Sequence, residues 1–143
     1  DVVIAADVIE HVRNPDELLA DLAGRMDPAG TIIASVPNFG HWYPRLRTVA
    51  GLFDYDQRGI LDRTHVRFFT RRSFRRTLAN TGLVTTTASY AGLPLDVLAV
   101  EGALGTIVAA GDGLARRVWP TLFAHQFVVR LEPAPHLLDP PVT

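Results

Sequence analysis

The chain has 143 residues, of which 48% are hydrophobic and 20% are charged, a composition typical of one globular domain with a single core. Its formal net charge of −1 gives no overall reason to expect a nucleic-acid partner. The absence of cysteine excludes disulfides and thiolate metal sites, and it fits a reducing cytoplasm. The most apolar long segment, residues 93–113, is interrupted by Asp96 and Glu101, so we expect no membrane span.

A continuous apolar run, DVVIAADV, opens the chain and predicts a strand over residues 1–8, covered on both faces as in a parallel sheet. Because no cap or turn precedes this run, we expect the chain to be a piece cut at a strand, with an exposed apolar flank there. A helix is predicted next, with Asn14 as its N-cap, Pro15 at its first position and leucines at helical spacing. A turn and a second buried strand over residues 31–37 follow.

The order strand, helix, strand predicts a crossover unit of a doubly wound α/β sheet. In such sheets ligands bind beyond the carboxyl ends of the strands. Two polar clusters follow the two predicted strands, namely residues 7–11 and the sequence PNFGHW at residues 37–42. We therefore expect both clusters on one rim of the sheet.

The rest of the chain predicts a mixture of loop, helix and strand. The segment 38–70 is too long for an ordinary connection between a strand and a helix, and we interpret it as a lid insertion over the rim. Thr70 and Gly82 bound a predicted helix, and a strand rich in β-branched residues follows over 83–90. The last predicted parts are a helical insertion over about 94–118, a closing strand within 123–133 that ends the domain near residue 132, and a Pro-rich tail over 133–143.

Basic residues are unevenly distributed. All fourteen are arginines, and nine lie between Arg45 and Arg76 against three aspartates. Two interpretations remain open: a solvated surface, or a site for an acidic or phosphorylated substrate.

With these segments considered together, the chain resembles the C-terminal half of a class I S-adenosylmethionine-dependent methyltransferase, similar to the type 11 and type 23 families. The resemblance rests on DVVIAADVIEHVRNPDELL, MDPAGTIIASVPNFGHW, GILDRTHVRFFTRRSF and FAHQFVV. It implies a partial Rossmann-like fold that supplies strands four to seven of a seven-stranded sheet, the last strand antiparallel and inserted beside the fifth.

The resemblance also implies a cofactor. Ala6, Asp7 and Val8 would contact S-adenosylmethionine, whereas the Gly-rich loop and the acidic residue that hold its other parts in this family have no counterpart in the chain. The glycines of GALGTIVAAGDG do not follow a predicted strand and are rejected as a nucleotide loop. We therefore expect the fragment itself to be inactive.

Asp7, Glu10 and His11 have the spacing i, i+3, i+4, which predicts one face of a single helical turn. In some members of the superfamily a similar motif holds a divalent metal together with a downstream histidine, whose place His65 takes here. Two carboxylates and two imidazoles suit Mg²⁺, Mn²⁺ or Fe²⁺. Two alternatives stay open: His11 or His65 acts as a general base, or the side chains have purely structural roles.

The second cluster supplies candidates for the acceptor pocket. Its aromatic and polar side chains could wall that pocket, and an arginine from the lid could pair with a phosphate or carboxylate of the acceptor. Packing within the lid is the alternative for the aromatic rings. The candidate substrate residues are Asn38, Phe39, His41, Trp42 and Arg67.

The resulting hypothesis is methyl transfer to an oxygen of a small molecule, lipid or glycan, carried out by a full-length parent. Nucleic acid is not expected as a partner, and the sequence does not indicate an oligomeric state. The alternative is a non-catalytic, methyltransferase-like module that binds a partner or RNA through Arg45–Arg76.

Overall fold

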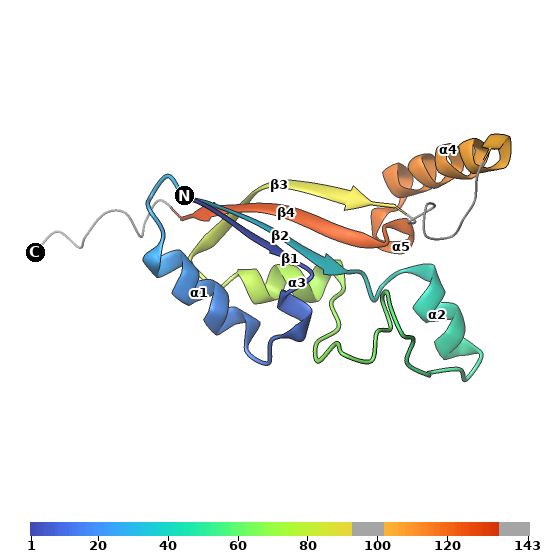
Figure 1. The fold of residues 1–143 in the computed structure, drawn as a ribbon, viewed down its shortest axis with the longest axis horizontal. Helices are drawn as coiled ribbons and strands as arrows, with labels where there is room; N and C mark the ends of the chain where they lie inside the picture. Colours follow the sequence, from blue (N-terminus) through green and yellow to red (C-terminus); the bar gives the residue numbers. More distant parts are fainter. Residues whose placement is uncertain (93–101, 135–143) are drawn as a thin grey trace, which may run out of the picture.

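The computed structural model describes residues 1–92 and 102–134, which form one four-stranded sheet with helices around it (Figure 1). The sheet has the order β1-β2-β4-β3. In chain order the elements are β1 (Val2–Ala6), the short 3₁₀ helix η1 (Ile9–His11), α1 (Pro15–Arg25), β2 (Thr31–Pro37), α2 (Trp42–Val49), α3 (Arg71–Leu78), β3 (Leu83–Ala91), α4 (Gly102–Val118), α5 (Pro120–Phe123) and β4 (Gln126–Pro133).

The predicted crossover unit is confirmed. β1 and β2 pair in parallel, from Val2 opposite Thr31 to Ala6 opposite Ser35, and α1 connects them. Pro15 begins α1, as expected, because proline has no N–H to lose there. Asn14 occupies the N-cap position as predicted, but its side chain makes no capping hydrogen bond, and its Nδ2 donates to Glu17 Oε2 at 3.0 Å.

The closing strand has the predicted direction and place. β4 lies between β2 and β3 and is antiparallel to both, with a β-bulge in β3 between Thr85 and Thr87. The order of strands four, five, seven and six of a Rossmann-like methyltransferase sheet is therefore present, and the predicted partial fold is confirmed.

One face of the sheet carries the core. Alternate residues of β2 and β4 are buried there, among them Ile32, Val36 and Leu131 at 0% exposure. α1 and α3 lie together along this side in Figure 1 and bury Leu19 and Phe74 against it. Period-two strands and amphipathic helices thus produce a two-layer domain.

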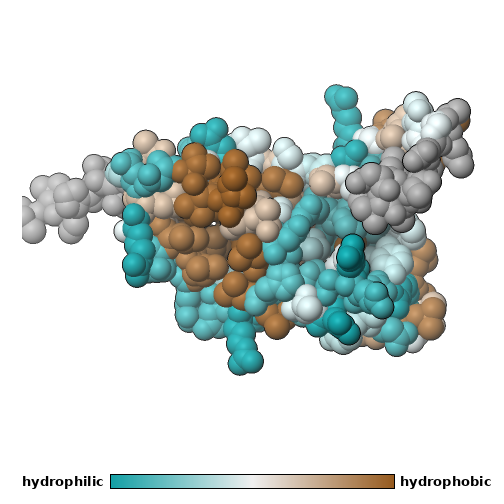
Figure 2. Space-filling model, viewed as in Figure 1, coloured by the Kyte–Doolittle hydropathy of each residue, from teal (hydrophilic) through white to brown (hydrophobic). Residues whose placement is uncertain are grey.

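The opposite face of β1 and β2 is open. Val2 and Ile4 are 68% and 71% exposed, and Ile33 of the neighbouring strand is 39% exposed. Figure 2 shows the hydrophobic patch that results over this part of the sheet. The expected exposed apolar flank of the first strand is therefore present, and it extends from the β1 edge onto the sheet face.

The insertions contain structure that the sequence pattern did not predict in full. The lid segment 38–70 contains α2, which His41 caps by accepting a hydrogen bond from the Tyr43 N–H. α4 occupies most of the predicted helical insertion, and residues 93–101 and 135–143 lie outside the described part of the chain. Among the described residues, no helix combines the length and hydrophobicity that a membrane crossing needs.

Candidate functional site

The carboxyl ends of β1 and β2 lie at the same rim of the sheet, because the two strands are parallel and in register. At this rim the chain leaves β1 through Asp7, whose φ of +52° lies in the left-handed region. The Asp7 N–H donates to Ser35 Oγ at 3.1 Å, which ties the turn to the adjacent strand. η1 begins two residues later.

The position of Asp7 differs from the predicted one. The spacing i, i+3, i+4 predicted one helical face, but Asp7 precedes η1 and its backbone is not helical. Its Oδ1 instead accepts hydrogen bonds from Ser35 Oγ and Gln126 Nε2, two side chains of neighbouring strands. Asp7 therefore stands beside the metal-type cluster rather than inside it.

The remaining three predicted ligands are brought together. One ligand-type atom from each of Glu10, His11 and His65 lies within 4.8 Å of the other two. His65 Nε2 is 3.8 Å from Glu10 Oε1, and the centroids of the two imidazole rings are 4.9 Å apart. A carboxylate and two imidazoles form a donor set suited to a divalent transition metal.

Backbone hydrogen bonds hold the lid segment against η1. The N–H groups of Val66 and Arg67 both donate to the Glu10 carbonyl, at 3.0 and 2.9 Å. His65 immediately precedes these two residues, so the same contact brings its ring to the rim. Residues separated by more than fifty positions in the chain thus form one cluster.

Both imidazoles are oriented by backbone carbonyl groups. His11 Nδ1 lies 3.1 Å from the Thr64 carbonyl oxygen, and His65 Nδ1 lies 3.3 Å from that of Ile60. A carbonyl can only accept, so each Nδ1 is the donor, and in the neutral form of each ring Nε2 then keeps its lone pair. This is the arrangement that metal-binding histidines usually show.

Glu10 is the most unusual member of the cluster. Its side chain is 1% exposed, and neither carboxylate oxygen has a hydrogen-bond partner in the part of the chain that the structure describes. Burial raises the pKa of Glu10, and the Asp7 charge acts in the same direction. Burial also lowers the pKa of His65, with a further contribution from His11. A cation between these groups would satisfy the two orphaned oxygens.

The cluster lines a pocket of about 460 Å³ at the rim. Asp7 lies on its wall, and so do two residues at the start of the last strand, His125 and Gln126. Sequence reasoning did not select these two residues, although they lie in the segment FAHQFVV on which the family resemblance partly rests. Burial lowers the pKa of His125, which favours a neutral imidazole at this wall.

The second predicted cluster does not line this pocket beyond Pro37. Asn38 is fully buried, its Nδ2 donates to the carbonyl groups of Thr121 and Ala124, and its Oδ1 accepts from the Gly40 N–H. Its predicted substrate role is therefore replaced by a structural one, because its side-chain oxygen and nitrogen are both used in joining β2 to the α5 segment.

The other candidate substrate residues of that cluster do not line the cluster pocket either. His41 is 1% exposed and caps α2, while Trp42 is 37% exposed on the surface. Phe39 packs on Phe68 and Phe53, at ring-centroid distances of 4.9 and 6.2 Å. The alternative of packing within the lid describes Phe39 better than a wall of the cluster pocket does, whereas Trp42 is not buried in the lid.

Arg67 does not line the cluster pocket. Its Nε and Nη2 both donate to the Arg13 carbonyl, and it lines a separate depression between α1 and α3. The predicted contact of Arg67 with an acceptor in the cluster pocket is therefore not what the structure shows. The guanidinium instead ties the lid to the segment that precedes α1.

Comparisons with known proteins agree with this fold. Residues 1–88 match the family model described as a methyltransferase domain. A SAM-dependent methyltransferase from Archaeoglobus fulgidus superposes with a TM-score of 0.55 at 16% identity, over 92% of this chain and 58% of that protein. The small RNA methyltransferase HEN1 gives a TM-score of 0.56 at 16% identity, over 93% of this chain and 14% of that protein.

A third structure, a Haloferax volcanii complex of the Trm112 methyltransferase activator with a putative methyltransferase, gives a TM-score of 0.51 at 14% identity, over 94% of this chain and 54% of that chain. The chain thus spans less than two thirds of each structure, and no curated protein matches it. The matched family model covers more than half of the chain and agrees with the strand order described above. The resemblance drawn from the sequence is confirmed, and the chain belongs to the methyltransferase-domain family.

Proposed function

We propose that this chain forms the acceptor side of a S-adenosylmethionine-dependent methyltransferase that transfers a methyl group to an oxygen of a small molecule, lipid or glycan. The observation that carries the proposal is the cluster of Glu10, His11 and His65 at the carboxyl rim of a methyltransferase sheet. Ligands of α/β sheets bind at this rim.

The open strand β1 supports a longer parent protein. Val2 and Ile4 expose apolar side chains at a sheet edge, a position where the remaining strands of a seven-stranded sheet would pair. Ala6, Asp7 and Val8 are exposed at the end of the same strand, so they would adjoin a cofactor held mainly by that other half. Because no strand is followed by a Gly-rich loop within residues 1–92 and 102–134, methyl transfer is assigned to the longer protein and not to the chain alone.

The cluster fits a divalent metal, Mn²⁺, Fe²⁺ or Mg²⁺, held by Glu10, His11 and His65. The buried carboxylate without a partner and the two carbonyl-oriented imidazoles support this fit. When bound, such a cation would lower the pKa of an acceptor hydroxyl and so favour an oxygen nucleophile. Asp7, with one oxygen already bonded to Ser35 and Gln126, would orient the rim and face the cofactor.

A metal-free variant of the proposal uses the same atoms. Nε2 of His11 or His65 keeps a lone pair, so either ring could accept the proton of the acceptor hydroxyl. Both rings are also near a carboxylate that would stabilise the imidazolium formed. The two variants differ in their dependence on a cation.

The test uses the longer protein that contains this chain. His65→Ala is expected to lower methyl transfer by roughly 100-fold or more, with the affinity for S-adenosylmethionine nearly unchanged, because one of three ligands is lost. Excess Mn²⁺ should restore part of the rate, and EDTA should reproduce the loss in the unmodified protein. His41→Asn, which removes an imidazole outside the cluster, is the matched control and should keep the rate.

Two outcomes would change the proposal. A rate that is insensitive to EDTA but abolished by His65→Ala assigns His65 as a base and removes the metal. A protein that gives no calorimetric response to S-adenosylmethionine contradicts the methyltransferase proposal itself. Acceptors should be screened with RNA included, since α3 carries four exposed arginines and one structural neighbour is a small RNA methyltransferase.

A further inference from the structure

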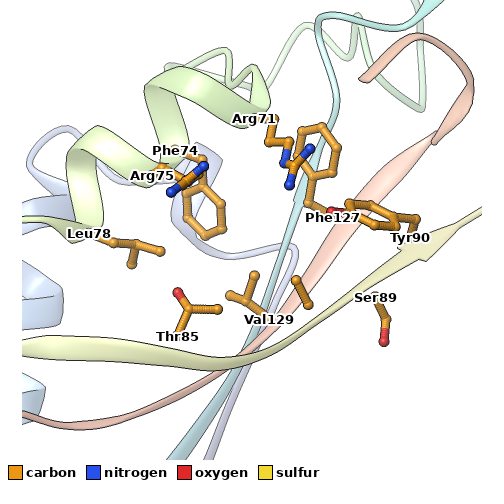
Figure 3. A pocket seen from close by; sticks show the side chains of 10 residues that line it. Arg71, Phe74, Arg75, Leu78, Thr85, Ser89, Tyr90, Phe127 and Val129 are labelled. Atoms are coloured by element: carbon orange, nitrogen blue, oxygen red, sulfur yellow. The ribbon is translucent and has the colours of Figure 1, made fainter. Parts of the chain in front are cut away.

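A second pocket lies between α3 and the strands β3 and β4 (Figure 3). It has a volume of about 290 Å³ and shares none of its lining residues with the cluster pocket. Its floor is apolar and consists of Phe74, Leu78, Tyr90, Phe127 and Val129. A volume of this size lies at the lower end of the range for small-molecule sites.

Two arginines of α3 complete this pocket. Figure 3 shows the guanidinium groups of Arg71 and Arg75 on the same side as the aromatic rings of the floor. The Arg71 Cζ lies 5.7 Å from the centroid of the Tyr90 ring. The pocket therefore joins an apolar floor to two cationic groups.

The charge of α3 is not balanced by nearby acids. The helix carries Arg71, Arg72, Arg75 and Arg76 within eight residues, and among the described residues none of the four forms an ion pair with a carboxylate. Like charges spaced i, i+4 repel each other along a helix. An anion placed between Arg71 and Arg75 would relieve this repulsion and accept hydrogen bonds from both guanidinium groups.

The apolar floor and the paired arginines suit chemically different parts of one ligand. A bare phosphate would leave the floor in contact with water, and a neutral apolar molecule would leave the guanidinium groups without a partner. We propose that this pocket binds a small amphipathic anion, an alkyl or aryl phosphate or carboxylate. Its apolar body lies on Phe74, Phe127 and Val129, and its charged group lies between Arg71 and Arg75.

The position of the pocket makes the proposal independent of the rim. β3 is the sheet edge opposite β1, so strands that pair with β1 in a longer protein leave the α3 pocket open. The pocket also does not use Glu10, His11 or His65. Binding here can therefore be measured with or without methyl transfer.

Isothermal titration calorimetry with octyl phosphate tests the proposal on the chain or on the longer protein. The double variant Arg71→Gln/Arg75→Gln is expected to bind roughly tenfold more weakly or worse, since both charge-assisted contacts are lost. The matched control is Arg72→Gln/Arg76→Gln, which removes the same charge from the same exposed helix but from residues that do not line the pocket. This control should bind octyl phosphate as tightly as the unmodified protein.

Additional ligands and a further variant test the two halves of the site separately. Octanol and inorganic phosphate should each bind far more weakly than octyl phosphate. Ala88→Leu, which fills the pocket without changing its charge, should also weaken binding. Circular dichroism melting of each variant verifies that it is folded before its affinity is compared.

The proposal is overturned by any of three results. Equal weakening by the two arginine pairs would show a general cationic surface, as an RNA-binding helix would give. Tight binding of octanol would show that the arginines play no part. Inorganic phosphate that binds as tightly as octyl phosphate would show that the apolar floor plays no part.

Discussion

Two polar clusters follow neighbouring parallel strands at the same rim, and Glu10 of the first and Asn38 of the second are used in opposite ways. After β1, the buried Glu10 leaves both carboxylate oxygens without a hydrogen-bond partner. After β2, the buried Asn38 uses both its amide nitrogen and its amide oxygen within the protein. A buried polar group without a partner destabilises the fold, whereas a fully bonded one supports it. This difference distinguishes Glu10, a candidate site residue, from Asn38, a scaffold residue.

The largest expected effect is on the scaffold side. Asn38→Ala should lower the free energy of unfolding by about 3 kcal/mol, because it leaves the Gly40 N–H and the carbonyls of Thr121 and Ala124 buried without partners. Urea denaturation followed by circular dichroism measures the change. Asn80→Ala, at an exposed asparagine, is the control and should alter stability by less than about 0.5 kcal/mol. Equal stability of both variants would contradict the scaffold role.

A second effect is a pH dependence of stability that comes from His41 of the second cluster. Burial, with a further contribution from His125, lowers the pKa of His41 from 6.5 to about 4. The unfolded chain therefore binds a proton at this residue below pH 6.5 while the folded chain does not, so stability is lost as the pH falls from 6.5 towards 4. Between pH 7 and pH 5 the contribution of His41 is about 2 kcal/mol.

His41→Asn tests this contribution, because asparagine can still accept the hydrogen bond that caps α2 but does not titrate. The difference in unfolding free energy between pH 7 and pH 5 should shrink by about 2 kcal/mol in the variant. Urea denaturation at the two pH values provides the measurement. An unchanged difference would mean that His41 accepts a proton in the folded state.

The smallest effect has the opposite sign and concerns the candidate site. Glu10→Gln should raise the free energy of unfolding by about 1 kcal/mol at pH 7 in the presence of EDTA, because an amide is less costly to bury than an unpaired carboxylate. The raised pKa of Glu10 predicts the same sign of effect. The contribution of the Glu10 carboxyl group to the free energy of unfolding is present below pH 4.5 and is lost as the pH rises through the folded-state pKa.

Added Mn²⁺ should reverse this order, since the cation stabilises only the chain that retains the carboxylate. Thermal melting with EDTA and with Mn²⁺ measures both effects on the same two proteins. If Glu10→Gln is destabilising without metal and Mn²⁺ shifts neither melting temperature, Glu10 belongs with Asn38 as part of the scaffold.

Local patterns in the sequence were sufficient to predict most of the fold. The apolar runs of β1 and β2, Pro15 at the start of α1 and Thr70 at the cap of α3 act over a few residues and were read directly. The insertion of β4 beside β2 came from the family resemblance and not from these local patterns. α2 was missed because its sequence, WYPRLRTV, has an aromatic and proline-containing first turn, and its His41 cap is only effective in the folded lid.

The candidate site depended more on tertiary contacts. The sequence by itself determined that Glu10, His11 and His65 are ligand-type residues in motifs at a strand end and in a lid, because residue type and motif are local properties. Only the tertiary structure decided which polar groups have partners: it turned Asp7 towards Ser35 and Gln126, enclosed Asn38 under α5, and left Glu10 without a partner. Hydrogen-bond satisfaction depends on residues far apart in the chain, and no local pattern contains it.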